Sequence, residues 1–287
     1  EYETQYLKIH TRNIPFYEKI EKAFENTQAC GVRVYRPPHR ITEALLPEQF
    51  VGEFKVMRTY FSDAVALLSC HAIPITYEGD CDYAAVFGDD ALYFENKHKK
   101  VILDMSAALL LKEKGIDVGI EDIAEAPSPR FEFFDKEKVL LHGIEAHAKF
   151  VAPALKDGAC VKSRYDTGSV ASFEYKNFLV LNFDAFSVNE GCTLYCSYGR
   201  GKQIHEFLGN PYPSICGYAD LYSICAKRDN KHIVLFQNLS LDPIFDFDIT
   251  LPKPCKRMKL LGAKGKIKGN KIHITTEFGA QSTFLLE

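Results

Sequence analysis

The sequence lacks several features that would define a class of protein directly. It contains no tryptophan, which offers the largest aromatic face for stacking on a sugar. No apolar stretch approaches the ~20 residues needed to span a bilayer, and the pattern predicts no secretion leader. The net charge of -3 gives no general attraction to nucleic acid or anionic lipid. We therefore expect neither nucleic acid nor a membrane among its partners.

Cysteine is present but follows no familiar pattern. The nine cysteines are an odd number without a repeated spacing, whereas disulfide scaffolds are smaller and denser in cysteine. The closest pair, Cys192 and Cys196, forms CxxxC, and no second pair matches it, which disfavours a structural zinc. We expect mostly buried thiols in a reducing compartment, namely the cytoplasm, with no metal and no cofactor.

The length of 287 residues, 46% of them hydrophobic and 25% charged, suits a globular chain with one large or two ordinary domains. The chain begins with Glu1 rather than Met, so we expect a processed product or a piece of a longer protein. A helix is predicted over residues 13–27, with Asn13 as cap, Pro15 in the first turn and an apolar face formed by Tyr17, Ile20 and Phe24. Residues 1–29 are accordingly assigned to a leading helical segment.

Alternating strand and helix patterns follow and predict an α/β domain over residues 30–212. Parallel βαβ units with a sheet covered on both faces are the expected arrangement, in a flavodoxin-like parallel sheet. Residues 126–176 lack helical periodicity and are assigned to short edge strands or an inserted β segment. The predicted strands are Gly31–Pro37, Ala72–Gly79, Tyr83–Asp90, Lys100–Asp104 and Phe178–Phe186, and the predicted helices are Phe61–Cys70, a run from Ala107, and Gly199–Gly209.

The pattern changes after the linker "GNPYPS", residues 209–214. Short strands follow closely without helices, and Gly269-Asn270 predicts a tight turn between two of them. Residues 213–287 therefore read as a small antiparallel β-sandwich. The basic run over residues 253–271 has no interleaved aromatics for nucleic-acid stacking, so its lysines are assigned to the wet face of edge strands.

The order of these segments resembles the C-terminal portion of bacterial β-galactosidase-like glycoside hydrolases. The resemblance rests on "YLKIHTRNIPFYEKI", "VILDMSAALLLKEKG", "LVLNFDAF" with the following "GRGKQIHEFL", and "HIVLFQNLSLDP". It implies a glutamine-amidotransferase-like α/β domain that serves in oligomer formation, followed by a β-sandwich. It also implies an upstream catalytic barrel that carries the two catalytic carboxylates, so no catalytic residue is assigned in this chain.

The stretch from Leu103 to Ala107 has the strand–turn–helix layout that hydrolases use to present a nucleophile. A nucleophile elbow needs small residues around the nucleophile, and this turn has neither a flanking glycine pair nor a cysteine. Ser106 is therefore interpreted as a helix cap. Asp104 is an alternative cap, or a ligand-binding group at the carboxyl end of a strand, where open α/β sheets collect ligands.

Other short motifs lack the residue spacing or the position that a catalytic, metal-binding or phosphate-binding site requires. Cys70 ends a helix, where no helix dipole lowers its pKa, and sequence neighbours such as His71 rarely point at each other. His142 and His147 are five residues apart, which fits neither zinc-protease spacing. The aspartates of "YEGDCDY" and "GDD" read as solvated turn formers, and "GRGKQ" lacks a complete phosphate-binding loop.

We therefore expect a non-catalytic structural and oligomerisation region of a carbohydrate-active enzyme, with a homo-oligomeric partner and an upstream barrel. A carbohydrate-binding module, with Tyr212, Tyr218 and Tyr222 as stacking faces, is one alternative. A degenerate amidotransferase-like hydrolase that uses Ser106 or Cys70 is the other. The ligand-binding candidates are Asp104, Ser106 and His71.

Overall fold

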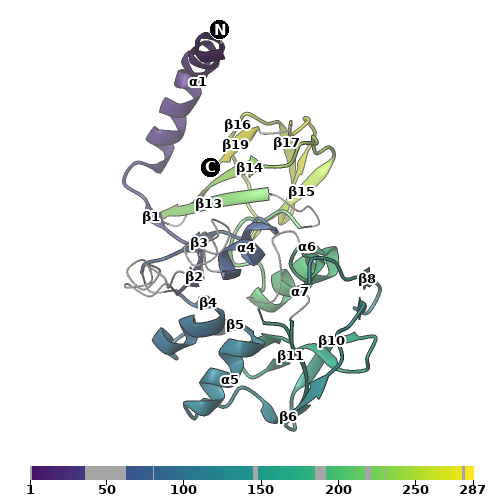
Figure 1. The fold of residues 1–287 in the computed structure, drawn as a ribbon. Coiled ribbons are helices and arrows are strands. Elements are labelled where there is room, and N and C mark those ends of the chain that lie inside the picture. The colour runs from purple at the N-terminus through teal and green to yellow at the C-terminus, as the bar shows by residue number, and fades with distance from the viewer. Residues whose placement is uncertain are drawn as a thin grey trace.

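The chain forms a mixed α/β structure with a helix at one end. The computed structural model describes residues 2–35, 63–79, 81–144, 148–184, 192–216, 221–229, 231–279 and 282–287. Figure 1 shows the α1 helix projecting from an antiparallel β unit that carries the C-terminus, with a larger unit of strands and helices beneath it. No helix in the described parts of the chain is long and apolar enough to cross a membrane.

A nine-stranded sheet organises the larger unit. One half is parallel, because its neighbouring strands pair in the same direction from edge to centre. The strands are short and almost wholly apolar, which is the pattern of a sheet buried on both faces. In spatial order they are β3 (Ile75–Thr76), β2 (Val32–Val34), β4 (Tyr83–Val86), β5 (Lys100–Asp104) and β12 (Phe178–Leu181).

The other half of this sheet is antiparallel, so the parallel flavodoxin-like sheet expected from the sequence is not confirmed. The change of direction occurs at Lys176-Asn177, a two-residue turn that pairs Tyr175 with Phe178. A turn this short can only reverse the chain, whereas a parallel neighbour needs a crossover of a dozen residues or more. The reversed strands are β11 (Val170–Tyr175), β10 (Cys160–Tyr165), β7 (Phe131–Phe133) and β8 (Lys138–Leu140).

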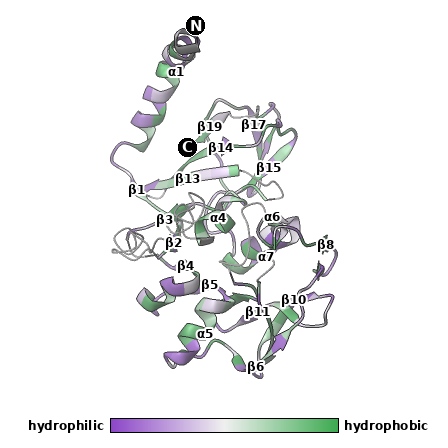
Figure 2. Ribbon diagram, in the orientation of Figure 1, coloured by the Kyte–Doolittle hydropathy of each residue, from purple (hydrophilic) through white to green (hydrophobic). Residues whose placement is uncertain are grey.

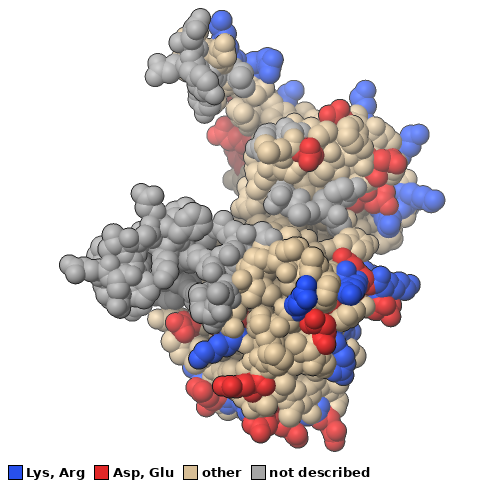
Figure 3. Space-filling view, turned by 45° about the vertical axis from the view of Figure 1, so that its right-hand side comes forward, with Lys and Arg blue, Asp and Glu red and all other residues tan. Residues whose placement is uncertain are grey.

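These reversed strands lie within residues 126–176, where the sequence predicts edge or inserted β structure. A separate antiparallel ribbon pairs β9 (Phe150–Leu155) of this region with β6 (Ile120–Ala126), which begins before it. Acidic side chains gather at this end of the molecule in Figure 3, and β6 itself exposes Glu121, Asp122 and Glu125. Elsewhere on the described surface of that face, basic and acidic side chains are interspersed.

Helices cover the sheet on both faces because side chains of each strand alternate between them. Ile102 of β5 packs in the core with α4 (Asp63–Ser69), α6 (Thr193–Cys196) and α7 (Tyr198–Leu208). Its neighbours Val101 and Leu103 belong to the opposite core, with α5 (Met105–Glu113) and the short 3-10 helix η2 (Gly88–Tyr93). Figure 2 shows hydrophobic residues on α4, α5 and α7.

Two antiparallel sheets form the C-terminal unit, as the sequence predicts. They share a core centred on the rings of Phe236, Phe247, Phe278 and Phe284. The predicted turn at residues 269–270 is confirmed, because Lys268 pairs with Lys271 across it. The strands are β13 (Leu221–Arg228), β14 (Lys231–Asn238), β19 (Thr283–Leu286) and β16 (Leu260–Leu261) in one sheet, and β15 (Phe247–Thr250), β18 (Lys271–Ile274) and β17 (Gly265–Lys268) in the other.

The leading helix α1 (Tyr2–Phe24) is longer than predicted and runs through Pro15. Its C-terminal end packs on the sheet of β14 and β19 through Ala23 and Phe24. The expected apolar face is partly wrong, because Tyr17 is 46% exposed. After the helix, β1 (Gln28–Ala29) pairs with β13, so the leading segment is joined to the C-terminal sheet. The boundaries at residues 29/30 and 212/213 stay predictions.

Candidate functional site

The corner between β5 and α5 is held by Asp104. This residue ends β5 in an extended conformation and is the N-cap of the helix. Its Oδ1 accepts hydrogen bonds from the backbone N–H of Ala107 at 2.8 Å and of Gly88 at 2.9 Å, and the side chain is fully buried. The carboxylate thus satisfies the helix start and also ties it to the turn that follows β4.

The sequence prediction that Ser106 caps this helix is wrong. Ser106 is the second residue of α5, and an N-cap must lie before the first helical residue, where its backbone is extended. Among the described residues, no imidazole is hydrogen-bonded to its hydroxyl. The predicted strand–turn–helix layout is present, but the polar side chain at its turn is Asp104, which binds backbone N–H groups.

His71 is a buried structural residue. Its Nε2 donates to the carbonyl oxygen of Tyr195 at 2.6 Å, and its own carbonyl accepts from Nε2 of His205 at 3.1 Å. Burial lowers the pKa of His71 to about 3, so the ring is neutral at neutral pH. The ring also fills the space beside Gly201, because a Cβ on that glycine would lie 2.4 Å from Nδ1 of His71.

Cys70 directly follows α4 and donates its backbone N–H to Ala66 at 3.1 Å. The His71 ring next to it is turned toward the carbonyl of Tyr195 and toward Gly201 of α7. The three ligand-binding candidates are therefore not joined in one site: Asp104 is bonded to Ala107 and Gly88, and His71 to Tyr195 and His205. Whether any of them binds a ligand stays a prediction.

A buried ion pair, which the sequence analysis did not find, joins α7 to the antiparallel half of the sheet. Nη2 of Arg200 lies 2.9 Å from both carboxylate oxygens of Glu132 on β7, and both side chains have no exposed surface. Nε of Arg200 donates to the carbonyl oxygen of Leu194 at 3.0 Å. The guanidinium also lies 5.4 Å and 5.7 Å from the ring centroids of Phe134 and Phe183.

Three neutral side chains complete this network. Ser163 donates to Glu132 and shares a hydrogen bond with Ser172. Gln203 accepts from Arg200 and donates to the Ser172 hydroxyl. Burial raises the pKa of Glu132, and the Arg200 guanidinium opposes that effect. Every member has a partner, which is the condition for a buried polar network to stabilise one arrangement of the core.

A signal for this pair was present in the sequence. Glu132 stands between Phe131 and Phe133 in a strand, where a charge alternating with aromatic residues needs a partner if it faces inward. Arg200 lies between two glycines in "GRGKQ", where the absence of side chains allows close packing. A Cβ on Gly199 would lie 2.6 Å from the ring of Phe134. The sequence alone did not show that these two segments meet.

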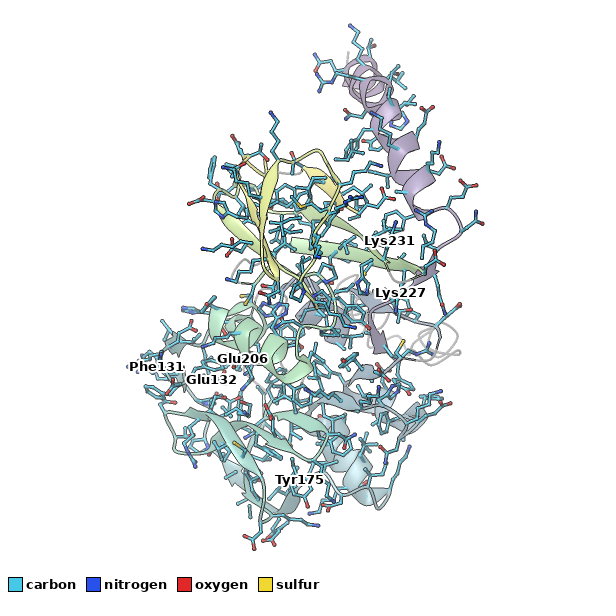
Figure 4. All side chains as sticks on the ribbon, turned by 180° about the vertical axis from the view of Figure 1, so that it is seen from behind. Phe131, Glu132, Tyr175, Glu206, Lys227 and Lys231 are labelled. Atoms are coloured by element: carbon cyan, nitrogen blue, oxygen red, sulfur yellow. The ribbon has the colours of Figure 1, made fainter. Side chains whose placement is uncertain are left out.

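Beside this network an open groove of about 400 Å³ runs between α7 and the β7–β8 hairpin. It carries both signs of charge, with Lys162 bonded to Glu174 at 3.0 Å and Lys202 lying 3.7 Å from Glu206. Figure 4 shows Glu206 on α7 at the side of the molecule where Phe131 and Glu132 of β7 lie. The groove is therefore supplied with hydrogen-bond donors and acceptors from several elements.

Two further residues distinguish this groove. Tyr198, the first residue of α7, is 56% exposed and lines it. Glu137 lines it as well, and its Oε2 is buried without a hydrogen-bond partner among the described residues. A buried carboxylate oxygen that lacks a donor is costly, so this position favours a ligand or solvent donor.

The remaining sequence candidates are the tyrosines predicted to stack on a sugar and the pair of histidines. Tyr212, predicted as a stacking face, is turned inward: its hydroxyl donates to Gly31 at 2.8 Å, and burial raises its pKa. Tyr218 lies outside the described residues, as does His147, while His142 is exposed. Within the described ranges, no group of three or more His, Cys, Asp or Glu side chains is placed to hold a metal ion.

The charged stretches also have ordinary partners. Of the loop acids, Asp82 forms an exposed ion pair with Lys99 at 2.8 Å. Asp90 is buried in η2, so the interpretation as a solvated turn former is wrong for that residue. In the basic run, Lys266 and Lys268 point to solvent from β17, and Lys271 bonds Asp248 at 3.1 Å. These lysines lie on the solvent-exposed face of the C-terminal sheet, as the sequence predicts.

Comparison with solved structures finds a similar fold in parts of two glycoside hydrolases. An α-L-fucosidase, isoenzyme 2 from Paenibacillus thiaminolyticus, matches with a TM-score of 0.59 and 12% identity over 94% of this chain and 51% of that one. A β-galactosidase from the psychrophilic Marinomonas ef1 matches with a TM-score of 0.50 and 9% identity over 97% of this chain and 41% of that one. The chain thus spans about half the length of these enzymes or less.

These similarities define a fold rather than an activity, because the identities are low. No model of a known protein family matches the sequence. No curated protein matches it either. The chain has a β-galactosidase-like fold of the kind found in part of larger glycoside hydrolases.

Proposed function

We propose that this chain is a non-catalytic structural and oligomerisation region of a carbohydrate-active enzyme, a β-galactosidase-like glycoside hydrolase. Its larger unit would be a variant of a glutamine-amidotransferase-like, flavodoxin-like domain in which the parallel half of the sheet continues into antiparallel strands. The catalytic barrel would precede it in a longer cytoplasmic enzyme. The fold it shares with about half of an α-L-fucosidase supports this proposal.

The hydrogen bonds made by the candidate site residues and by the buried ion pair also support a structural role. Asp104 bonds two backbone N–H groups, and His71 bonds one carbonyl. Arg200 and Glu132 neutralise each other within a closed network. Groups held in this way stabilise a fold and are not free to exchange protons with a substrate.

The observation that carries the oligomerisation role is a seam of exposed side chains on α1. Leu7 is 60% exposed, Ile14 38% and Tyr17 46%, and the ring of His10 lies 5.9 Å from that of Tyr17. The spacing 7, 10, 14, 17 is that of two heptads, which places all four residues on one side of a helix.

The seam is distinct from the face by which α1 packs on its own chain. That face includes Phe16 and Ala23: Ala23 packs on the C-terminal sheet, and a Cβ on Gly262 would lie 3.4 Å from the ring of Phe16. Phe24, one heptad after Tyr17, continues the line of the seam to the point where the helix meets its own sheet. At about 100° per residue, Phe16 and Ala23 point away from Leu7 and Ile14. The seam therefore stays exposed while α1 is attached, and a second copy of the same helix offers a matching apolar surface.

Light scattering on the purified chain tests this proposal. We expect a defined oligomer for the parent chain and for Gln5→Glu, which adds a charge on the opposite side of α1. The double variant Leu7→Glu/Ile14→Glu should be monomeric with an unchanged circular dichroism spectrum, because two carboxylates in the seam must be desolvated on association. A monomeric parent chain, or an oligomer that the double variant leaves intact, would contradict the role of the seam.

Carbohydrate binding is a second candidate function, and the groove beside α7 favours it. A sugar offers hydroxyl donors and acceptors together with an apolar ring face. The groove supplies carboxylates, lysines and the exposed ring of Tyr198. It also supplies Oε2 of Glu137, which has no hydrogen-bond partner in the described part of the chain. This differs from the sequence expectation, which assigned stacking to residues such as Tyr212.

Titration calorimetry against a panel of oligosaccharides tests this second candidate. Binding should be weakened about two- to tenfold or more by Tyr198→Ala, because stacking on an aromatic ring contributes about 0.5–1.5 kcal/mol. Tyr93→Ala is the matched control, since Tyr93 is an exposed tyrosine of the η2 helix. The absence of heat with every sugar, or binding that Tyr198→Ala leaves unchanged, would remove carbohydrate binding at this groove.

A further inference from the structure

Two thiols distant in sequence meet where the leading segment joins the C-terminal sheet. Sγ of Cys30 lies 3.3 Å from Sγ of Cys225, although 195 positions separate them in the chain. Both cysteines are free in this structure. The contact is distinct from every motif that the sequence suggested, since the closest cysteines in sequence are Cys192 and Cys196.

The backbone holds the two residues directly opposite each other. Ala29 pairs with Ala226 in the antiparallel ladder of β1 and β13, and the backbone N–H of Cys30 donates to the carbonyl oxygen of Cys225 at 3.0 Å. Opposed residues bonded in this way have Cα atoms about 5.5 Å apart. Disulfides span Cα distances of about 4.4–6.8 Å, so the bond requires only small changes of the side chains.

The surroundings make one thiol reactive and the other a resolving partner. Cys30 is partly exposed, whereas Cys225 is buried in the core of the C-terminal unit. The hydrogen bond with Cys225 lowers the pKa of Cys30, and the ammonium of Lys227 acts in the same direction. Figure 4 shows Lys227 on β13 near the base of α1. A partly exposed thiol whose pKa is lowered, placed beside a second thiol, is the arrangement typical of redox-sensitive cysteines.

We propose that Cys30 and Cys225 form a reversible disulfide that joins the segment after α1 to β13. A small-molecule disulfide such as oxidised glutathione serves as the oxidant. The Cys30 thiolate attacks one of its sulfurs, forming a mixed disulfide and releasing one glutathione thiolate. Cys225 then loses its proton to that thiolate and attacks Sγ of Cys30, releasing the second glutathione. Two protein thiols are oxidised, and one glutathione disulfide is reduced to two thiols.

The bond would close a very long loop and fix the base of α1 on the sheet. Constraining a long loop stabilises the folded chain relative to the unfolded one. The oxidised chain should therefore unfold at a temperature roughly 5 °C or more above that of the reduced chain. Reduction by dithiothreitol should restore the original midpoint.

Mass spectrometry of the folded chain after oxidation by glutathione disulfide tests the proposal. We expect the parent chain and Cys160→Ser to lose the mass of two hydrogen atoms, with a peptide that joins Cys30 to Cys225. Cys160 is the exposed cysteine, so its substitution controls for surface oxidation. Cys30→Ser should give no such peptide and no rise in the unfolding midpoint.

Three results would overturn the proposal. One is continued alkylation of both Cys30 and Cys225 after oxidation, and another is a bond that joins a different pair. The third is a lasting glutathione adduct on Cys30, which would mean that Cys225 cannot reach it. Because Cys225→Ser also alters a buried position, Cys30→Ser with the mass readout is the deciding variant.

Discussion

Arg200 and Glu132, 68 positions apart in the chain, form an ion pair without exposed surface, with one guanidinium nitrogen 2.9 Å from both carboxylate oxygens. The pair connects α7 to the antiparallel half of the large sheet. Glu132 lies on β7, well inside the antiparallel half and apart from the β11–β12 turn at which the direction of the sheet changes. We infer that the pair fixes α7 on these strands and so shapes the groove beside the helix.

Removing one partner of this pair should be strongly destabilising. We expect Arg200→Met to lower the free energy of unfolding by about 3–5 kcal/mol, because Glu132 is left as an uncompensated buried charge. Lys202→Met, at the exposed pair with Glu206, should change it by less than about 1 kcal/mol. Urea unfolding measures both, and a similar small effect for the two variants would show that the buried pair does not hold α7.

Substitutions at the turn between β5 and α5 distinguish Asp104 from Ser106 as the helix cap. Asp104→Ala should cost about 2–3 kcal/mol of unfolding free energy, since it removes a helix cap and leaves the Gly88 N–H without its acceptor. Ser106→Ala should stay within about 0.5 kcal/mol, because its side chain is not the cap. Chemical denaturation of both variants checks this, and the reverse order of costs would restore Ser106 as the cap.

Gly201 and His71 should show strong energetic coupling. Gly201→Ala should destabilise the parent chain by about 1–3 kcal/mol, because its Cβ would overlap the His71 ring. In a His71→Ala background the space is open, and the same change should stabilise the helix by up to about 1 kcal/mol. A double-mutant cycle from unfolding curves measures the coupling, and equal effects in both backgrounds would contradict the close packing.

His71 should also make stability depend on pH. Its pKa of about 3 in the folded chain is below its ordinary value of about 6.5. Between these values the unfolded chain binds a proton that the folded chain excludes. The free energy of unfolding should therefore fall by up to about 1.4 kcal/mol per unit as the pH falls from about 6.5 toward 3.

Denaturation at several pH values should give a shallower dependence for His71→Gln, whose amide still donates to a carbonyl. The control is His142→Gln, at an exposed histidine, and it should follow the parent chain. Parallel curves for His71→Gln and the parent chain would show that His71 is not the group responsible.

Much of the architecture follows from local pattern. The strand Lys100–Asp104, the turn at Gly269-Asn270 and the short strands of the C-terminal unit are readable because alternation, apolar runs and turn residues act over a few positions. The antiparallel direction of β11 was not predicted from the sequence, although it is set by a turn of only two residues, Lys176-Asn177. Neither residue there is glycine, and Lys176 adopts a φ of +52° that its type rarely shows.

The buried contacts were harder to foresee, for a physical reason. Glu132 and Arg200, His71 and Gly201, and Cys30 and Cys225 are each brought together by packing between elements far apart in the sequence. Local pattern gives the residue types but not the pairing. Asp104 was partly predictable, because the sequence allowed either Asp104 or Ser106 as the helix cap. The choice between them depends on which residue begins the helix, and local pattern does not give that position.

Turnover by the chain itself tests the central claim most directly. The purified chain should be incubated with aryl α-fucosides and aryl β-galactosides, and in parallel with fluorophosphonate and iodoacetamide probes. We predict hydrolysis no faster than with heat-denatured chain, and no fluorophosphonate label on Ser106. Hydrolysis that is abolished by Ser106→Ala, by Cys70→Ala or by a single carboxylate substitution would contradict a structural role and establish a catalytic centre in this chain.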